Sequence, residues 1–155
     1  MKPLGFSILP ADNSHYNNLT NMIFTMYKEE DNCDDMTPEK AEKIIHFLFS
    51  HPECGQIFIV QQTKTSQIVG YFILTFSYNV EYARPLLSIE DLYIRPAFRS
   101  RGLGSICMDF ISDFGKKKEA LLILEVSPGN LSAKELYLRK GFSIVQNSIF
   151  MRKLS

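Results

Sequence analysis

The chain has 155 residues, of which 45% are apolar and 22% charged, and its 17 basic and 17 acidic side chains give no net charge. This length predicts one domain that buries a core without disulfides or metal, and the neutral balance argues against a dedicated nucleic-acid binder. The neutrality is a cancellation, however, because residues 1–94 carry 12 acids and 6 bases (net −6) and residues 95–155 carry 5 acids and 11 bases (net +6).

The cysteines indicate a reducing compartment. Cys33, Cys54 and Cys107 are odd in number and show no Cys-x-x-Cys spacing, so neither a disulfide framework nor a metal site is expected. No apolar run reaches the ~18 residues of a membrane span, and no apolar stretch of signal-peptide type follows the first residues. We therefore expect a cytoplasmic protein with no membrane partner.

The first third of the chain is predicted to form one strand and two helices. Phe6–Leu9 is expected to form the strand, and apolar residues at helical spacing over 16–26 predict the first helix. A polar loop over 29–36 ends that helix. Thr37 then offers an N-cap before a proline at the first helical position, which predicts a second helix that ends before His51.

From residue 56 onward the spacing changes to that of strands. β-Branched and aromatic residues are dense over 56–62, 68–77 and 86–94, and residues 63–67 have the composition of a hairpin loop. Residues 102–118 then return to helical spacing, with one apolar stripe.

The last part of the chain is predicted to alternate between strands and a helix. The nearly all-apolar run 121–126 predicts a strand buried on both faces. A turn at 127–130 leads into a helix that Gly141 stops, and final strands are expected over 142–146 and 149–154. Strand, helix and strand within 86–126 imply a right-handed parallel crossover in a mixed sheet, so the fold class is α/β (α+β) in a single domain.

The segment 95–105 follows a strand and opens a helix. Gly102 and Gly104 let the backbone approach a ligand closely, and a helix N-terminus presents unpaired N–H groups. Three arginines, Arg99 and Arg101 among them, lie in this segment without an acid. These features predict a phosphate or pyrophosphate cradle; the alternative is a capped helix start with solvated arginines.

Two known phosphate motifs fit this segment poorly. A Walker P-loop needs Gly-x-x-x-x-Gly-Lys-Ser/Thr, which is absent. A Rossmann fingerprint needs a third glycine where Cys107 stands, and the turn from the preceding strand is too long. A dinucleotide-binding module is therefore a remote alternative.

The run Arg99-Ser100-Arg101-Gly102-Leu103-Gly104 resembles the Arg/Gln-x-x-Gly-x-Gly/Ala pyrophosphate loop of the GNAT superfamily of N-acetyltransferases. Residues 89–96 are similar to that family's fourth strand, and residues 124–142 to its second conserved block. The order of elements matches over nearly the whole chain. The resemblance implies a mixed, mostly antiparallel sheet with a central parallel pair of strands splayed apart, flanked by four helices.

The resemblance also implies a cosubstrate, acetyl-coenzyme A, in the opening between the fourth and fifth strands. Strand residues Leu92, Tyr93 and Ile94 would pair with the pantetheine arm, and Asn130 would bond it from the other side. An N–H near Leu92 would polarise the thioester carbonyl. The pyrophosphate would be held by the loop residues Arg99, Ser100, Arg101, Gly102, Leu103, Gly104 and Ser105.

The same resemblance implies two catalytic groups. Tyr137 stands where these enzymes carry the acid that protonates the departing thiolate; the alternative is a tyrosine that packs beside Leu136. Glu90 stands where several members carry the base that deprotonates the amine; the alternative is a strand carboxylate that anchors a loop. Strand alternation predicts that Asp91 points to the opposite face from Glu90. Cys107 lies in the apolar helical stripe and is expected to be a core thiol.

The loop after the first helix carries five acids, Glu29, Glu30, Asp31, Asp34 and Asp35. They would attract a cationic amine, although a solvated turn explains them equally well. Substrate contacts are expected from Tyr27, Glu30 and Asp31, and from Tyr78 and Glu81 after the third strand. The Glu90-Asp91 pair is also weakly similar to diamine and polyamine acetyltransferases.

The sequence thus favours an acetyl-coenzyme A-dependent N-acetyltransferase that acts on a small cationic amine by direct attack in a ternary complex. Two alternatives stay open: a protein N-terminal or lysine acetyltransferase, and a non-catalytic acyl-coenzyme A-binding regulatory module. No metal is expected. Whether the chain forms a homodimer, and which amine it accepts, are open at this level.

Overall fold

A computed structural model describes residues 5–30 and 35–154, and the chain divides into two compact units, residues 1–125 and 126–155. The first unit is a five-stranded sheet with three α-helices, and its strand order is β1-β2-β3-β4-β5. All neighbouring strands are antiparallel except the parallel pair β4–β5, as the sequence predicted. In chain order the elements are β1 (Phe6–Pro10), α1 (Tyr16–Glu29), α2 (Pro38–Ser50), β2 (Gly55–Gln62), β3 (Ile68–Asn79), β4 (Arg84–Ile94), α3 (Leu103–Lys117) and β5 (Leu121–Leu124).

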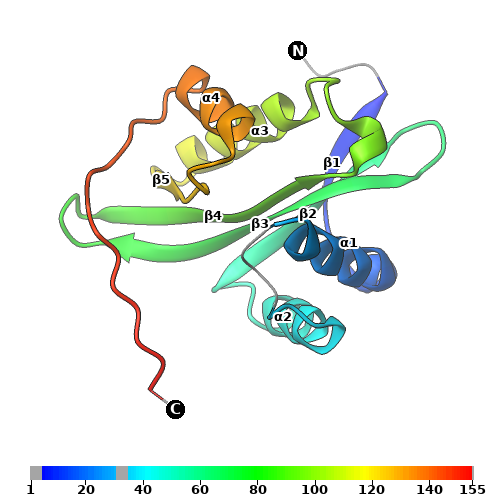
Figure 1. Ribbon diagram of the computed structural model, residues 1–155, viewed down its shortest axis with the longest axis horizontal. Helices are drawn as coiled ribbons and strands as arrows, with labels where there is room; N and C mark the ends of the chain where they lie inside the picture. The colour runs from blue at the N-terminus through cyan, green and yellow to red at the C-terminus, as the bar shows by residue number, and fades with distance from the viewer. Residues whose placement is uncertain (1–4, 31–34, 155) are drawn as a thin grey trace. The chain divides into compact units, whose positions relative to one another are not determined.

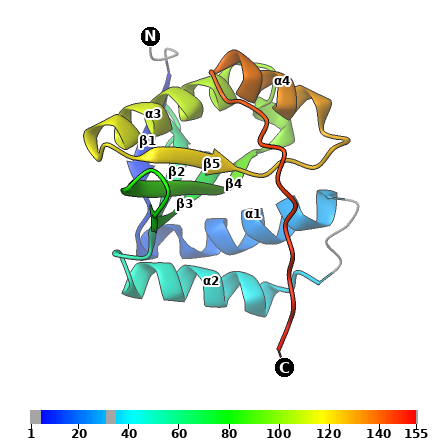
Figure 2. The ribbon, with the colours of Figure 1, turned by 90° about the vertical axis from the view of Figure 1, so that its left-hand side faces the viewer.

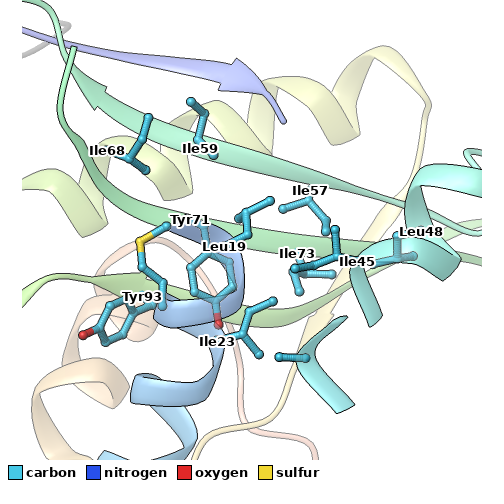
Figure 3. Close-up of a cluster of buried hydrophobic side chains, with 12 residues drawn as sticks. Leu19, Ile23, Ile45, Leu48, Ile57, Ile59, Ile68, Tyr71, Ile73 and Tyr93 are labelled. Carbon is cyan, nitrogen blue, oxygen red and sulfur yellow. The ribbon is translucent and has the colours of Figure 1, made fainter. Parts of the chain in front are cut away.

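Helices cover the sheet of the first unit on both faces. Helices α1 and α2 lie on one face and α3 on the other (Figures 1 and 2). On the α1/α2 face, apolar side chains of both helices pack against β2 and β3 (Figure 3); the cluster includes Leu19, Ile23, Ile45, Ile57, Ile59, Tyr71 and Ile73. Burial of such side chains is the main stabilising term of a fold of this size.

The α3 face of the sheet is aromatic. The ring of Phe58 lies 5.0 Å from that of Phe72 and 5.1 and 5.6 Å from those of Phe110 and Phe114 on α3. These contacts confirm the apolar stripe predicted for this helix and fix α3 against the sheet. The start of α3, which carries the glycine segment, is thereby held in place.

Local signals account for the helix starts. Thr37 Oγ1 accepts from the Lys40 N–H at 3.2 Å, and Pro38 is the first residue of α2, so the predicted cap is confirmed. Asp12 caps a short 3-10 turn, Asn13–His15, that leads into α1. None of the helices in the described ranges could span a lipid bilayer.

Strand β5 differs from its prediction in length and burial. It ends at Leu124, two residues early, and Ile123 is 44% exposed. Leu122 faces α3, where a Cβ on Gly115 would meet it at 3.0 Å, so Ile123 points to the opposite face. Helices α1 and α2 pack against β3 and β2 rather than against this edge strand, which leaves one of its faces uncovered.

The second unit holds α4 (Leu131–Arg139), which ends before Gly141 at φ +91° as predicted. The two strands predicted after it are wrong, because residues 142–154 adopt no regular secondary structure. Their apolar side chains are exposed, including Ile144, Val145, Ile149, Phe150, Met151 and Leu154. Alternating apolar residues favour a strand only where a neighbouring strand completes the ladder, and no strand among the described residues pairs with 142–154.

Candidate active site

Strand β4 extends beyond its parallel partner. The pairing of β4 with β5 runs from Leu86↔Leu121 to Ile89↔Leu124, whereas in the described sheet residues 91–94 pair with β3 alone and Glu90 has no register partner. Five residues of β4 therefore have one edge without a strand partner in the described sheet. Unpaired N–H and C=O groups on such an edge can accept an extended ligand as an added strand. This edge lies where the sequence predicted an opening between the parallel strands.

A β-bulge lies where the opening begins. On β3, Ile73 pairs with Asp91 and the next residue, Leu74, pairs with Ile89, so Glu90 is the extra residue. A bulge shifts the alternation of the strand beyond it. The prediction that Glu90 and Asp91 point to opposite faces is therefore wrong.

Hydrogen bonds place both carboxylates on the α1/α2 face. Glu90 Oε1 accepts from Thr75 Oγ1 at 2.7 Å, and Thr75 lies two residues beyond the core residue Ile73 on β3. Asp91 accepts from tyrosines of α1 and β3. Glu90 is exposed and Asp91 is 4% exposed, so the bulge brings one solvated and one buried carboxylate to the same face.

Asp91 is held by two tyrosine hydroxyls. Tyr27 donates to Oδ1 at 2.9 Å and Tyr71 donates to Oδ2 at 3.0 Å. Burial raises the pKa of Asp91, the two tyrosine donors oppose that rise, and the nearby charges of Glu90 and Glu30 add to it. Sequence reasoning missed this residue as part of the site. The available signal was a second acid beside Glu90 within an otherwise apolar strand.

A second polar group links the end of α1 to the end of β4. Arg99 Nη2 lies 2.8 Å from Glu29 Oε2, and Arg99 Nε donates to the Ile94 carbonyl at 2.8 Å. Its guanidinium lies 5.4 Å from the Tyr93 ring centre, and Tyr93 donates to Glu29 at 3.3 Å. Because the side chains of Arg99 and Glu29 are 46% and 39% exposed, this ion pair contributes little stability.

The glycine segment has the backbone geometry of an anion site. Ser100 and Gly102 have φ of +61° and +78°, and a Cβ on Gly102 would have nothing within 4 Å. In residues 5–30 and 35–154 no side chain caps α3, whose first internal hydrogen bond runs from the Ile106 N–H to the Gly102 carbonyl. The N–H groups of residues 103–105 therefore lack helical acceptors at the positive end of the helix dipole. With Arg99 and Arg101 in the same segment, these residues fit a pyrophosphate.

The structure places two of the predicted acceptor residues at the bulge. Tyr27 bonds Asp91, and the charge of Glu30 acts on the same carboxyl. Asp31 and Asp34 lie outside the described residues. The acidic patch at the opening is therefore made by the end of α1 and by β4.

Tyr78 and Glu81 lie elsewhere. Tyr78 pairs with Pro85, five residues and about 16 Å along β4 from Glu90. By alternation Tyr78 also shares a face with Phe76, whose ring contacts Phe114 of α3. Glu81 follows in the hairpin turn beyond it. The structure therefore does not bring Tyr78 and Glu81 to the acidic patch.

The second unit carries the other two predicted site residues. Asn130 Oδ1 accepts from the Ala133 N–H at 3.3 Å and so caps α4. The Tyr137 ring lies 6.0 Å from that of Phe142, and burial raises the pKa of the Tyr137 phenol. This tyrosine is therefore protonated throughout the neutral range, as a proton donor must be.

A comparison with known families decides which of them the chain joins. The family model described as acetyltransferase (GNAT) family matches residues 19–142, about four fifths of the chain. The chain belongs to the GNAT acetyltransferase family. It is an N-acetyltransferase that uses acetyl-coenzyme A.

Related proteins agree with this membership. This acetyltransferase is 25% identical over 126 residues to an uncharacterized N-acetyltransferase of the pepI 3′ region in Lactobacillus delbrueckii subsp. lactis, covering 76% of this chain and 73% of that one. It is 38% identical over 58 residues to streptothricin acetyltransferase of Streptomyces lavendulae, covering 37% of this chain and 31% of that protein.

Solved structures show the same fold. A possible acetyltransferase from Clostridium difficile 630 matches with a TM-score of 0.85 at 15% identity, covering 97% of this acetyltransferase and 99% of that chain. Aminoglycoside N-acetyltransferase AAC(6′)-Iy in complex with coenzyme A matches with a TM-score of 0.80 at 16% identity, covering 100% of both chains. The predicted fold class is thereby confirmed.

Cys107 of this acetyltransferase is fully buried in α3, and burial raises its pKa to about 12. A thiol reacts as its thiolate, so we expect iodoacetamide at pH 8 to leave Cys107 unmodified in the native protein and to modify it in denaturant. Peptide mass spectrometry measures the labelling of Cys107 in the native protein and in denaturant. Partly exposed Cys54 is the internal control, and rapid native labelling of Cys107 would contradict its assignment as a core thiol.

Proposed function

We propose that this acetyltransferase moves the acetyl group of acetyl-coenzyme A directly to the primary amine of a small cationic substrate, within a ternary complex. The observation that carries the proposal is the exposed Glu90 carboxylate on the α1/α2 face, beside the unpaired edge of β4 and close to the charges of exposed Glu30 and buried Asp91. Clustered carboxylates raise the local concentration of a cation and orient it. Two of the matched proteins are named for small-molecule acceptors, streptothricin and aminoglycosides, which supports the same class.

The cosubstrate side of the proposal uses backbone groups. Leu92, Tyr93 and Ile94 lie on the unpaired edge and would pair with the pantetheine arm, and Asn130 would add a side-chain bond. An N–H near Leu92 would polarise the thioester carbonyl and stabilise the oxyanion. The pyrophosphate would be held by Arg99, Ser100, Arg101, Gly102, Leu103, Gly104 and Ser105. Bound acetyl-coenzyme A supplies the activated acetyl group.

Two side chains would move protons. An amine binds as ammonium and must lose a proton before it attacks; Glu90, solvated and oriented by Thr75, would take that proton directly or through a water. Tyr137, whose pKa is raised by burial, would donate a proton to the thiolate as it leaves. The place of Tyr137 in the family's second conserved block supports this assignment.

The Glu90→Gln variant is expected to lower kcat/KM for the amine by about 10- to 100-fold near neutral pH, because the isosteric amide keeps the contact to Thr75 but cannot accept the proton. The deficit should shrink as the pH approaches the pKa of the amine itself, about 10, because the free amine needs no base. Rates over pH 6–10 measure this. A wild-type rate at neutral pH, or a deficit that stays constant with pH, would contradict the assignment.

The acceptor class is tested by the release of coenzyme A thiol from acetyl-coenzyme A in the presence of single acceptors. We expect diamines, polyamines or aminoglycosides to give the highest kcat/KM, and neutral amino acids to give little release. Release with basic peptides alone would instead identify a protein acetyltransferase. No acceptor-dependent release at all would point to a non-catalytic acyl-coenzyme A-binding module.

We further propose that the whole chain acts as a single acetyltransferase domain in the cytoplasm, which the scattered cysteines support. A metal ion is not required by this mechanism. Size-exclusion chromatography with light scattering will show whether a homodimer forms.

A further inference from the structure

We propose that Asp91 is a positioning residue that fixes the unpaired edge of β4 in the geometry that binds the cosubstrate. The inference rests on the proposed function in one respect, namely that acetyl-coenzyme A lies along this edge. Asp91 would not touch the reacting atoms. It would act through the backbone of the residues that follow it, Leu92 to Ile94.

The edge needs such support because only one side of it is paired. Within the part of the chain that the structure describes, residues 91–94 pair with β3 alone, and the bulge at Glu90 interrupts that ladder. Bulges bend the strand and increase its twist, so the direction of the edge depends on what holds the bulge. The pairing beyond the bulge is close: a Cβ on Gly70 would meet the Tyr93 carbonyl oxygen.

Asp91 is placed to hold the bulge from two independent elements. Tyr27 comes from the last turns of α1 and Tyr71 from β3, and each donates to a different oxygen of the same carboxylate. Tyr71 is itself fully buried in the core and contacts Met26 Sδ at 3.2 Å, so its hydroxyl is fixed. Backbone movement at residue 91 would break both hydrogen bonds.

The cost of burying a carboxylate indicates that Asp91 serves the geometry of the strand rather than the stability of the fold. Among the residues that the structure describes, Asp91 is the one charged side chain that is buried. A buried carboxylate is costly, and a well-packed apolar residue at such a position is often as stable or more so. What an apolar residue cannot do is accept two directed hydrogen bonds that fix the strand beside the opening.

The test compares Tyr27→Phe and Asp91→Asn with the wild type, and Tyr16→Phe serves as the matched control. Tyr16 is also on α1, and its hydroxyl contacts His46 on the surface. Calorimetry measures the affinity for coenzyme A without an acceptor, and hydrogen exchange of the free protein compares peptides of residues 90–94 with those of 84–89. Tyr27→Phe keeps the ring and the Tyr71 bond, so it is expected to fold even if Asp91→Asn does not.

We expect Tyr27→Phe to weaken coenzyme A binding about fivefold, the equivalent of one hydrogen bond, and Tyr16→Phe to leave it unchanged. Exchange should accelerate in residues 90–94 and not in 84–89, because a positioning role loosens the unpaired segment selectively. Unchanged affinity, or equal acceleration in both segments, would overturn the inference. The exchange experiment needs no cosubstrate, so failure of the wild type to bind coenzyme A would refute the proposed function and leave this test standing.

Discussion

The Tyr137→Phe variant is expected to lower kcat by about 10³-fold, within the range that a positioned general acid contributes. The phenol is the proposed donor to the departing thiolate, and phenylalanine keeps the ring that packs beside Phe142 while removing the proton. Because burial raises the pKa of Tyr137 above its usual value near 10, the wild-type rate should show no basic limb from this residue below about pH 10.

Steady-state kinetics and calorimetry separate this role from a structural one. The affinity for coenzyme A and the thermal midpoint should stay close to those of the wild type, since only a hydroxyl is lost. Tyr16→Phe removes a surface hydroxyl and should retain full activity. Full turnover by Tyr137→Phe would contradict the assignment of Tyr137 as the acid. A lower kcat accompanied by a lower thermal midpoint would indicate instead that the tyrosine serves packing.

The Gly102→Glu variant is expected to weaken coenzyme A binding by about 100-fold or more. Its carboxylate would stand at the N-terminus of α3, where the unpaired N–H groups of residues 103–105 would otherwise meet the pyrophosphate. Two like charges at one anion site repel each other strongly, and the left-handed φ of +78° adds strain for any side chain. A Cβ has open space there, so the variant is expected to fold.

The Gly102→Ala variant separates strain from charge. Alanine carries the same backbone strain, about 1–2 kcal/mol, without the carboxylate. Calorimetry should therefore show at most about a tenfold loss of affinity for alanine and a much larger loss for glutamate. Equal affinity of Gly102→Glu and the wild type would remove the pyrophosphate from this segment.

Features that depend on neighbouring residues could be predicted from the sequence. The Thr37 cap, the glycine segment and the stop at Gly141 are encoded within a few residues, and the structure shows each in place. The parallel pairing of β4 with β5 also followed from local order, because a strand, a helix and a second strand leave few connections open.

Features that depend on pairing partners could not be predicted in this way. The bulge at Glu90 is a property of the register between β3 and β4, so alternation within β4 alone assigned Asp91 to the wrong face. Tyr71 meets Asp91 only because these two strands pair, and Tyr27 only because α1 packs over them. Tyr78 was expected near the acceptor although the hairpin carries it away.

The wrong prediction of two strands after Gly141 has the same cause. Residues 142–154 have the composition of strands, but a ladder requires a second strand at hydrogen-bonding distance, which composition does not supply. The opposite net charges of the two halves of the sequence did predict where basic and acidic side chains lie in the structure. Arg99 and Arg101 lie beside the uncapped start of α3, and Glu30, Glu90 and Asp91 lie at the bulge.

Direct acetyl transfer requires the amine and acetyl-coenzyme A to be bound to the enzyme at the same time. Initial rates of thiol release, with acetyl-coenzyme A and the best cationic amine both varied, measure whether such a ternary complex forms. We expect double-reciprocal lines that intersect, because both substrates must be bound before the acetyl group moves and Cys107 is too deeply buried to carry it. Parallel lines, with an acetylated enzyme isolated in the absence of amine, would contradict direct transfer.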